Sequence, residues 1–196
     1  MRTRSSPLSR KWDLNFNARL AMIETKFKDT EVGKIPEDWD VVSLRDIGEV
    51  KMCKRVMKYQ TSAKGEIPFY KIGTFGKAAD AYIKYDLYKQ FKEKFSYPQK
   101  GDILLSAAGT IGRTVVFDGT PSYFQDSNIV WINNNEQRLV NKLLYYIYST
   151  LSWVTESGTI PRIYNSTVES IKFPIPSLKS EQRRIAEALS LSLIHI

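Results

Sequence analysis

The sequence has one cysteine and one histidine among its 196 residues, and each scarcity excludes a kind of chemistry. Cys53 has no internal partner for a disulfide, so we expect a small, half-buried thiol in the reducing cytoplasm. His195 stands in the last six residues, which look foreign to the rest of the chain. Histidine-dependent acid–base catalysis and histidine-containing metal sites therefore lose their main ingredient.

Long apolar runs and cofactor-binding motifs are also missing. No stretch approaches the roughly 18 consecutive apolar residues that a membrane-spanning helix needs. No Gly-x-Gly-x-x-Gly follows a strand, and no phosphate-binding Gly-x4-Gly-Lys-Ser/Thr loop is present. Paired cysteines for zinc are missing, as is the Asn/Asp-Pro-Pro-aromatic motif of DNA amino-methyltransferases. The chain is thus expected to bind no metal and no cofactor of its own.

Both ends of the sequence differ from its middle. Residues 1–21 carry five cations and one anion, so this segment supplies +4 of the chain's formal charge of +8. We expect residues 1–21 to be a disordered or artefactual leader without the apolar core of a signal peptide. Residues 191–196 match the translation of a transposase adaptor used in sequencing libraries, so we expect an adaptor-derived tail there.

What remains is the composition of one globular domain with a basic balance. Apolar residues make up 42% of the chain and aromatic residues 12%, which is ample for a core. A length of 196 residues suits one domain of about 150 residues with appendages. The pI near 9.4 is compatible with nucleic-acid binding, although half of the net charge lies in the leader.

The pattern of short apolar runs and turns predicts an α+β domain. Strands are expected at residues 40–44, 67–72, 103–106, 113–117 and 127–132, with one helical turn at 44–48. Leucine or isoleucine recurs every four residues from Leu139 to Leu151, which predicts one long amphipathic helix ending at Gly158. The aromatic and charged residues 80–97 predict a second amphipathic helix, with a base-stacking face as the alternative. Residues 50–64 are expected to form a basic loop that is either solvated or faces phosphates.

Two glycine-framed loops are the sharpest candidates for a binding role. Gly109-Thr-Ile-Gly-Arg113 combines close backbone approach with one guanidinium, which binds phosphate or guanine bidentately. Gly158 to Thr167 has the same ingredients, with Pro161 stiffening the loop that presents Arg162. Tyr164 can stack on a base, and Asn165 can bond base edges or phosphates. The simpler alternatives are an exposed hairpin turn and a connection that caps the next element.

Four ordered segments together resemble the target-recognition domain of the specificity subunit of Type I restriction–modification enzymes, over most of residues 26–189. The first two are Gly33-Lys-Ile-Pro-Glu-Asp-Trp39 and Gly65-Glu-Ile-Pro-Phe-Tyr-Lys-Ile-Gly73. The third joins Lys100-Gly-Asp-Ile-Leu-Leu-Ser106 to Gly109–Arg113, and the fourth runs from Gly158-Thr-Ile-Pro-Arg162 to Gln182. Each segment is weak singly, and one departure is Pro174-Ile-Pro-Ser-Leu178, where the family often has a further proline.

The resemblance implies a DNA-reading subunit that is not itself an enzyme. It implies a recognition domain over residues 22–178, with short twisted strands and one long helix, and the start of a coiled-coil spacer helix over 179–190. Double-stranded DNA would be the ligand, and methylation subunits would bind around the spacer, hold S-adenosylmethionine and recruit restriction subunits. A second recognition domain or copy would pair through the spacer. Under this interpretation the residues near DNA are Lys71, Thr74, Ser106, Thr110, Arg113, Arg162, Tyr164 and Asn165.

The spacer helix has candidate contact residues of its own. Ile185 and Leu189 are four residues apart, with Ala186 beside Ile185, and would be the first knobs of the coiled coil. A helix this short is marginal alone, so we expect residues 180–196 to be poorly anchored in this chain.

Three other functions stay open from the sequence. The chain could be the reading part of a single-chain restriction–methylation enzyme, with catalytic motifs upstream. It could be a general nucleic-acid-binding module, whose affinity would depend on salt but not on sequence. It could also be a scaffold whose helices only mediate assembly, and such a protein would bind no duplex.

Overall fold

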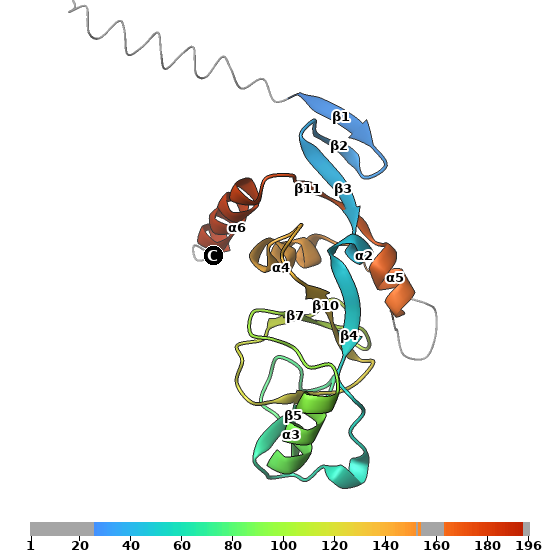
Figure 1. Ribbon diagram of the computed structural model, residues 1–196, viewed down its shortest axis with the longest axis vertical. Coiled ribbons are helices and arrows are strands. Elements are labelled where there is room, and N and C mark those ends of the chain that lie inside the picture. Colours follow the sequence, from blue (N-terminus) through green and yellow to red (C-terminus); the bar gives the residue numbers. More distant parts are fainter. Residues whose placement is uncertain (1–25, 152, 154–162, 194–196) are drawn as a thin grey trace, which may run out of the picture. The chain divides into compact units, whose positions relative to one another are not determined.

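The computed structural model describes residues 26–151, 153 and 163–193 (Figure 1). The chain divides into two compact units, residues 1–39 and 40–196. In the described part of the first unit, β1 (Phe27–Thr30) and β2 (Gly33–Pro36) form an antiparallel hairpin. Gly33 closes the turn with a φ of 109°, a left-handed conformation that favours glycine. Gly33-Lys-Ile-Pro, the start of the first segment of the resemblance, is therefore the second strand of this hairpin.

The second unit is organised around a four-stranded antiparallel sheet. Its strand order is β4-β10-β7-β8, so β10 is an inner strand that pairs with both β4 and β7. The strands are β4 (Gly48–Met52), β7 (Ile103–Ser106), β8 (Thr114–Val116) and β10 (Ile129–Asn134).

This sheet separates two hydrophobic cores. Along β10, Val130 and Ile132 belong to the first core, whereas Ile129 and Trp131 belong to the second. Alternate side chains of a strand point to opposite faces, so a buried run without polar residues is required where both faces are covered. The sequence meets this requirement, because the first four residues of β10 are all buried.

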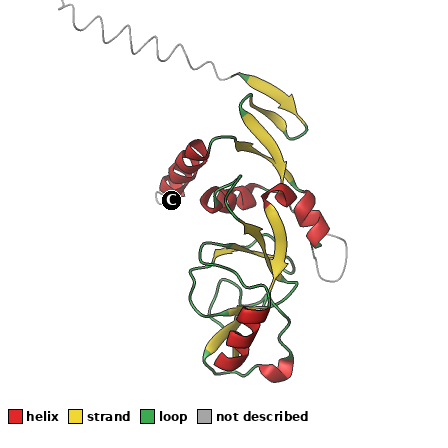
Figure 2. Cartoon of the chain, in the orientation of Figure 1, coloured by secondary structure: helices red, strands yellow, loops and turns green. Residues whose placement is uncertain are grey.

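The first core is covered mainly by helices, which lie on one side of the sheet in Figures 1 and 2. A two-stranded sheet of β3 and β11 adds Val42, Phe173 and Ile175 to this core. The elements are β3 (Trp39–Ser43), α2 (Leu44–Ile47), α4 (Asn141–Thr150), α5 (Asn165–Ser170), β11 (Lys172–Pro176) and α6 (Lys179–Leu193).

The second core is rich in aromatic rings and lies on the other face of the sheet. Tyr97 and Tyr123 stack with their ring centroids 6.1 Å apart, and Phe117 meets Phe124 edge-on at 5.7 Å. Strand β5 pairs with β6 antiparallel and with β9 parallel. The elements on this side are η1 (Lys58–Gln60), β5 (Ile67–Tyr70), β6 (Tyr82–Ile83), α3 (Tyr85–Lys94) and β9 (Tyr123–Phe124).

The predicted α+β class is confirmed, and three element predictions need correction. The long helix predicted from Leu139 begins at Asn141 and ends at Thr150, while residues 152 and 154–162 lie outside the described part of the chain. Strand β4 occupies the start of the predicted basic loop. In the aromatic segment a short strand precedes a helix that ends at Lys94, and Tyr88 packs in the core instead of offering a stacking face.

Helix α6 is held firmly at its first turns, contrary to the expected poor anchoring. The Gln182 side chain is fully buried and makes three hydrogen bonds to backbone groups. Ala186 is also fully buried in the first core, and Ile185 packs against that core. Ala186 is therefore not exposed as a knob for a partner helix in this conformation, whereas Leu189 is 38% exposed.

Candidate nucleic-acid interface

The basic loop between β4 and β5 is built as an ordered turn. Its short helix η1 begins after Met57, whose backbone N–H donates to the side-chain oxygen of Gln60 at 2.8 Å. The Thr61 hydroxyl and backbone N–H both donate to the carbonyl of Lys58. Ser62 then pairs with Tyr82 through two backbone hydrogen bonds of 2.9 and 3.0 Å. The loop is therefore fixed by its own residues and by the edge of β6.

A cleft of about 500 Å³ opens beside this loop. Its cations come from two segments, Arg55 and Lys58 from the loop and Lys71 from the end of β5. The opposite wall is the polar connection between β9 and β10. The remaining lining residues are Val56, Thr61, Phe69, Gln125, Asp126, Ser127 and Asn128.

Two interactions set the shape of the cleft. The Arg55 guanidinium donates to Asp126 at 2.8 Å, with the arginine side chain 67% and the aspartate 16% exposed. The Gln125 side-chain oxygen accepts the backbone N–H of Ile72 at 2.9 Å, which fastens the end of β5 to the opposite wall. Ser127 has a φ of 53°, an uncommon conformation for a residue other than glycine. An exposed ion pair of this kind contributes little to stability, so Arg55 remains available to an anionic ligand.

Lys71 and Thr74, both predicted near DNA, lie in one turn after β5. The Lys71 ammonium pairs with Asp80 at 2.8 Å. The Thr74 hydroxyl accepts the Lys71 backbone N–H at 3.2 Å and donates to the Lys71 carbonyl at 3.3 Å. Lys71 thus reaches the cleft, whereas the hydroxyl of Thr74 is used within the turn.

The predicted Gly109–Arg113 loop is held from inside by Ser106. This serine is buried; its hydroxyl donates to the Thr110 carbonyl at 2.5 Å and accepts the Arg113 N–H at 2.9 Å. The Ser106 side chain is enclosed and its hydrogen bonds are internal, so its place near DNA stays a prediction in which Ser106 shapes the loop from inside. Thr110 is exposed at the loop tip. The ring of Trp153 lies against Gly112, where a Cβ would collide with it.

Arg113 links the Gly109–Arg113 loop to the turn that follows β5. Its guanidinium donates to the carbonyl of Phe75 at 2.8 Å, next to the turn that holds Thr74. This bond orients the arginine and leaves other N–H groups of the guanidinium to a ligand. The Arg113 side chain is half-buried and hydrogen-bonded. The simpler alternative, an exposed hairpin turn with a merely exposed arginine, does not match it.

Of the second predicted loop, Gly158 to Thr167, the structure describes the residues from Ile163 onward, so Arg162 lies outside the described residues. The backbone N–H of Ile163 donates to the Ala107 carbonyl at 2.9 Å, which brings this segment beside the Gly109–Arg113 loop. Tyr164 is 50% exposed and precedes α5, and Asn165 is the exposed first residue of that helix. Lys71, Thr74, Thr110 and Arg113 thus belong to connected loops at the ends of β5 and β7, and Tyr164 and Asn165 lie at the start of α5, next to the segment that is bonded to Ala107.

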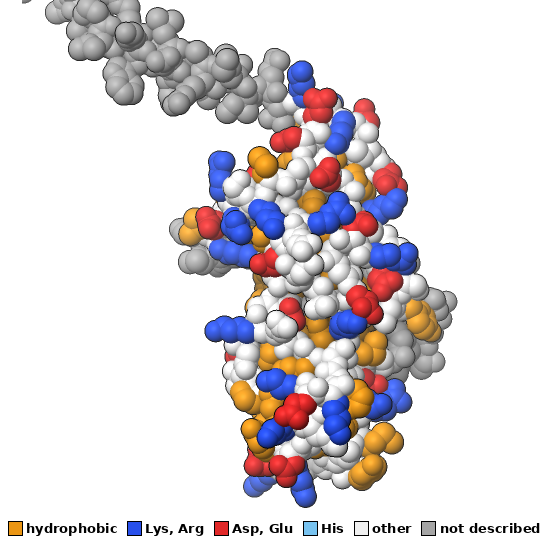
Figure 3. Space-filling model, viewed as in Figure 1, with side chains coloured by type: hydrophobic (Ala, Val, Ile, Leu, Met, Phe, Trp, Pro, Cys, Tyr) orange, Lys and Arg blue, Asp and Glu red, His pale blue; other side chains and the backbone are white. Residues whose placement is uncertain are grey.

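Sequence reasoning missed the wall formed by Gln125 and Asn128, and it singled out Arg55 and Lys58 only as part of a basic loop. The available signal was the polar run from Gln125 to Asn128 placed directly between two buried strands. A polar run of this kind is an ordinary connection until the fold sets it opposite a basic loop. On the face shown in Figure 3, Lys and Arg side chains are interspersed with Asp and Glu side chains.

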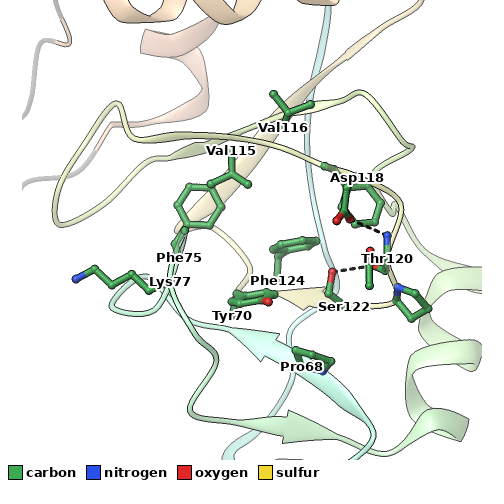
Figure 4. A pocket seen from close by; sticks show the side chains of 13 residues that line it. Pro68, Tyr70, Phe75, Lys77, Val115, Val116, Asp118, Thr120, Ser122 and Phe124 are labelled. Atoms are coloured by element: carbon green, nitrogen blue, oxygen red, sulfur yellow. Dashed lines mark hydrogen bonds between the residues drawn. The ribbon is translucent and has the colours of Figure 1, made fainter. Parts of the chain in front are cut away.

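A second hollow of about 280 Å³ lies on the same side of the sheet and is lined by Tyr70, Phe75 and Phe124 (Figure 4). Its rim is fixed by two hydrogen bonds, from the Thr120 N–H to Asp118 and from the Ser122 hydroxyl to the Thr120 carbonyl.

Within the described residues, no group of three or more His, Cys, Asp or Glu side chains is placed to hold a metal ion. The search of the same residues found no helix long and apolar enough to cross a membrane.

This arrangement defines an α+β domain that presents basic and polar loops on one side of a partitioning sheet and docks a helix on the other. The chain belongs to the family described as the Type I restriction modification DNA specificity domain, which matches residues 36–191. The departure at Pro174–Leu178 does not disturb this assignment.

Named relatives agree with this family. The chain is 58% identical over 150 residues to the Haemophilus influenzae protein named type I restriction enzyme specificity subunit S.HindORF215P, covering 76% of this chain and 39% of that protein. It is 31% identical over 183 residues to the MjaIX specificity subunit of Methanocaldococcus jannaschii, covering 85% and 40%. The chain therefore spans about two fifths of the length of these relatives.

A solved structure supports the fold. A chain from a study of complex assembly and conformational transition in the type I R-M system superimposes with a TM-score of 0.63 at 20% identity, over 96% of this chain and 46% of that one. At this identity the likeness speaks for the fold alone.

Proposed function

We propose that this chain reads a DNA sequence as one target-recognition domain of a type I restriction–modification specificity subunit. The observation that carries the proposal is the cleft in which Arg55, Lys58 and Lys71 face the amide-bearing wall of Gln125 and Asn128. Cations supply affinity for phosphates, and amide side chains are the groups that read base edges. A site that combines both suits sequence-specific binding better than charge alone.

The proposed division of labour leaves the chemistry to partners. The chain would be a non-catalytic subunit, working on DNA in the cytoplasm. Methylation subunits would hold S-adenosylmethionine and flip the target adenine, and restriction subunits would join through them. Family membership supports these partners, as does the similarity to subunits that are named for specificity.

Helix α6 would begin the spacer that sets the distance to a second recognition domain or copy. Its first turns are docked through Gln182 and Ala186, so the domain and the spacer would move as one body. Of the predicted contact residues, Leu189 is the most exposed and Ile185 is half-buried, so pairing would begin beyond Ala186.

Selection from a pool of duplexes with a random core tests the proposal. The 196-residue chain, alone and with the methylation subunits, should enrich one short motif and bind it at least a hundredfold more tightly than scrambled duplexes. Substituting Lys71 by alanine should weaken binding to all duplexes, and substituting Asn128 by alanine should relax the preference at one position. Affinity that depends on salt but is equal for every sequence would instead identify a general nucleic-acid-binding module.

A further inference from the structure

Tyr59 is a large, partly apolar residue that is almost fully exposed to solvent. Its side chain is 84% exposed, the largest exposure among the exposed large hydrophobic residues of the described part of the chain. Met57, two residues earlier, is 48% exposed. Large apolar side chains together at the tip of a loop are unfavourable in water unless a partner covers them.

The loop holds Tyr59 out by construction. Gln60 caps the Met57 N–H, and both donors of Thr61 converge on the carbonyl of Lys58, so the turn around Tyr59 is bonded on both sides. The Ser62–Tyr82 pairing then fastens the loop to β6. A ring that is presented by an ordered turn loses little entropy when it binds, which suits a residue that inserts into a ligand.

The charge around Tyr59 identifies the kind of partner. Residues 50–64 contain five lysines or arginines and no acidic residue. Lys51 pairs with Glu49 and Arg55 with Asp126, whereas no ion pair to a carboxylate is formed by Lys54, Lys58 or Lys64 within the described chain. Lys54 instead lies over the Phe95 ring, 5.0 Å from its centroid. An apolar tip on a loop whose lysines are not neutralised by carboxylates complements a polyanion whose interior is apolar, which is the chemistry of stacked bases between phosphates.

The position relative to the cleft points to the same ligand. Lys58 and Thr61, on either side of Tyr59, both line the polar cleft. A duplex whose base edges face Gln125 and Asn128 therefore has an adjacent groove within reach of the loop tip. Apolar side chains that enter a groove between base pairs unstack one step and bend the helix.

We propose that Tyr59 is a wedge that inserts between base pairs of bound double-stranded DNA, with Met57 beside it and Lys58 on the flanking phosphate. The inference rests on the proposed function and adds a mode of recognition to it. Specificity then includes the ease with which one base step unstacks, at a position that no polar side chain reads.

The test uses the 196-residue chain and the duplex enriched from the random pool, with 2-aminopurine placed at each adenine in turn. Insertion unstacks the neighbouring base, so fluorescence should rise severalfold at one step with the native chain. Tyr59→Ala should abolish the rise and weaken binding about tenfold, whereas Tyr59→Phe should keep both. Tyr85→Ala, which removes another exposed tyrosine outside residues 50–64, is the matched control and should change neither.

The outcomes distinguish failure of the Tyr59 wedge from failure of the proposed function. If a motif is enriched but fluorescence stays flat and Tyr59→Ala binds as tightly as the native chain, the wedge is overturned and the proposed function stands. If Tyr59→Ala leaves DNA binding intact but prevents co-purification of the methylation subunit, Tyr59 belongs to a protein interface. If no motif is enriched in the presence of the methylation subunits, both the proposed function and the wedge fail.

Discussion

The side-chain oxygen of Gln182 accepts a hydrogen bond from the backbone N–H of Val140 at 3.0 Å, across 42 residues of sequence. Val140 is the residue that precedes α4, so a side chain of α6 binds the entry of another helix. The Gln182 amide nitrogen donates to the carbonyls of Arg138 and Pro176, both at 2.8 Å. One buried glutamine therefore joins three segments of the first core.

Gln182→Ala should lower the free energy of unfolding by about 2–4 kcal/mol, because it leaves buried backbone groups without partners. Urea denaturation followed by circular dichroism measures the change. Arg183→Ala, at an exposed position one residue on, is the control and should stay within about 0.5 kcal/mol. Equal stability of both variants would show that α6 is not docked in this way.

Hydrogen exchange gives an independent check on α6. The amides near Ile185 and Ala186 should exchange at rates close to those of the central sheet, because this part of the helix is packed into the first core. In Gln182→Ala the same amides should exchange much faster while those of β10 change less. Fast exchange of these amides in the native chain would restore the expectation of a poorly anchored helix.

Ser106→Ala should destabilise the domain by about 1–3 kcal/mol and loosen the Gly109–Arg113 loop, because the buried hydroxyl bonds both Thr110 and Arg113. Thermal unfolding together with proteolysis of the loop measures the two effects. Thr110→Ala, at the exposed tip, should leave stability nearly unchanged. A drop in DNA affinity for Ser106→Ala without loss of stability would mean that Ser106 contacts DNA after all.

Arg113→Ala and Arg162→Ala should each cost about 1–3 kcal/mol of binding free energy if the guanidinium contacts guanine. Arg113→Lys should restore little of this loss, because a lysine lacks the planar fork that binds bidentately. Titration of the enriched duplex in a fluorescence anisotropy assay gives the affinities. Unchanged affinity for both alanine variants would place the DNA on another face.

Burial raises the pKa of the Cys53 thiol to about 12, well above its usual value near 9. The unfolded chain releases this proton at lower pH than the folded chain, so the contribution is unchanged below pH 9. Above pH 9 stability should fall by about 1.4 kcal/mol per pH unit until the pH approaches 12. Cys53→Ala should remove the share of this fall that the thiol causes. Burial also raises the pKa of Tyr97, Tyr123 and Tyr148 above the ordinary value of 10, so these tyrosines add a fall of their own above pH 10. At pH 8 a disulfide reagent should label the thiol only after urea is added.

The strands and the fold class could be predicted because they depend on local apolar runs, such as residues 103–106 and 129–132. The length of α4 could not, because the four-residue spacing of Leu139 to Leu151 continues into residues that pack without being helical. Leu139 is buried before the helix begins, which gives it the same sequence signal as a helical leucine.

The site was predictable only in part for a similar reason. Glycine-framed loops reveal where the backbone turns, and Arg113 is predicted as a DNA contact on that basis. They do not reveal that Ser106 points inward, because a serine at a strand end has the same local sequence on either face. The pairing of Arg55 with Asp126 joins residues 71 positions apart, and no local pattern predicts such a contact.

The four-stranded sheet between the two cores also limits where the sequence can gain or lose residues. A one-residue insertion that shifts the register of β10 would turn Val130 and Ile132 toward the aromatic core. It would also turn Ile129 and Trp131 toward the helices, so one added codon would disrupt the packing of both cores. The connection at residues 53–66 does not contribute alternate side chains to both cores. Over evolutionary time, insertions and deletions should accumulate in this connection and be purged from β10, which lets the reading loops diverge while the helix attached to the opposite face keeps its place.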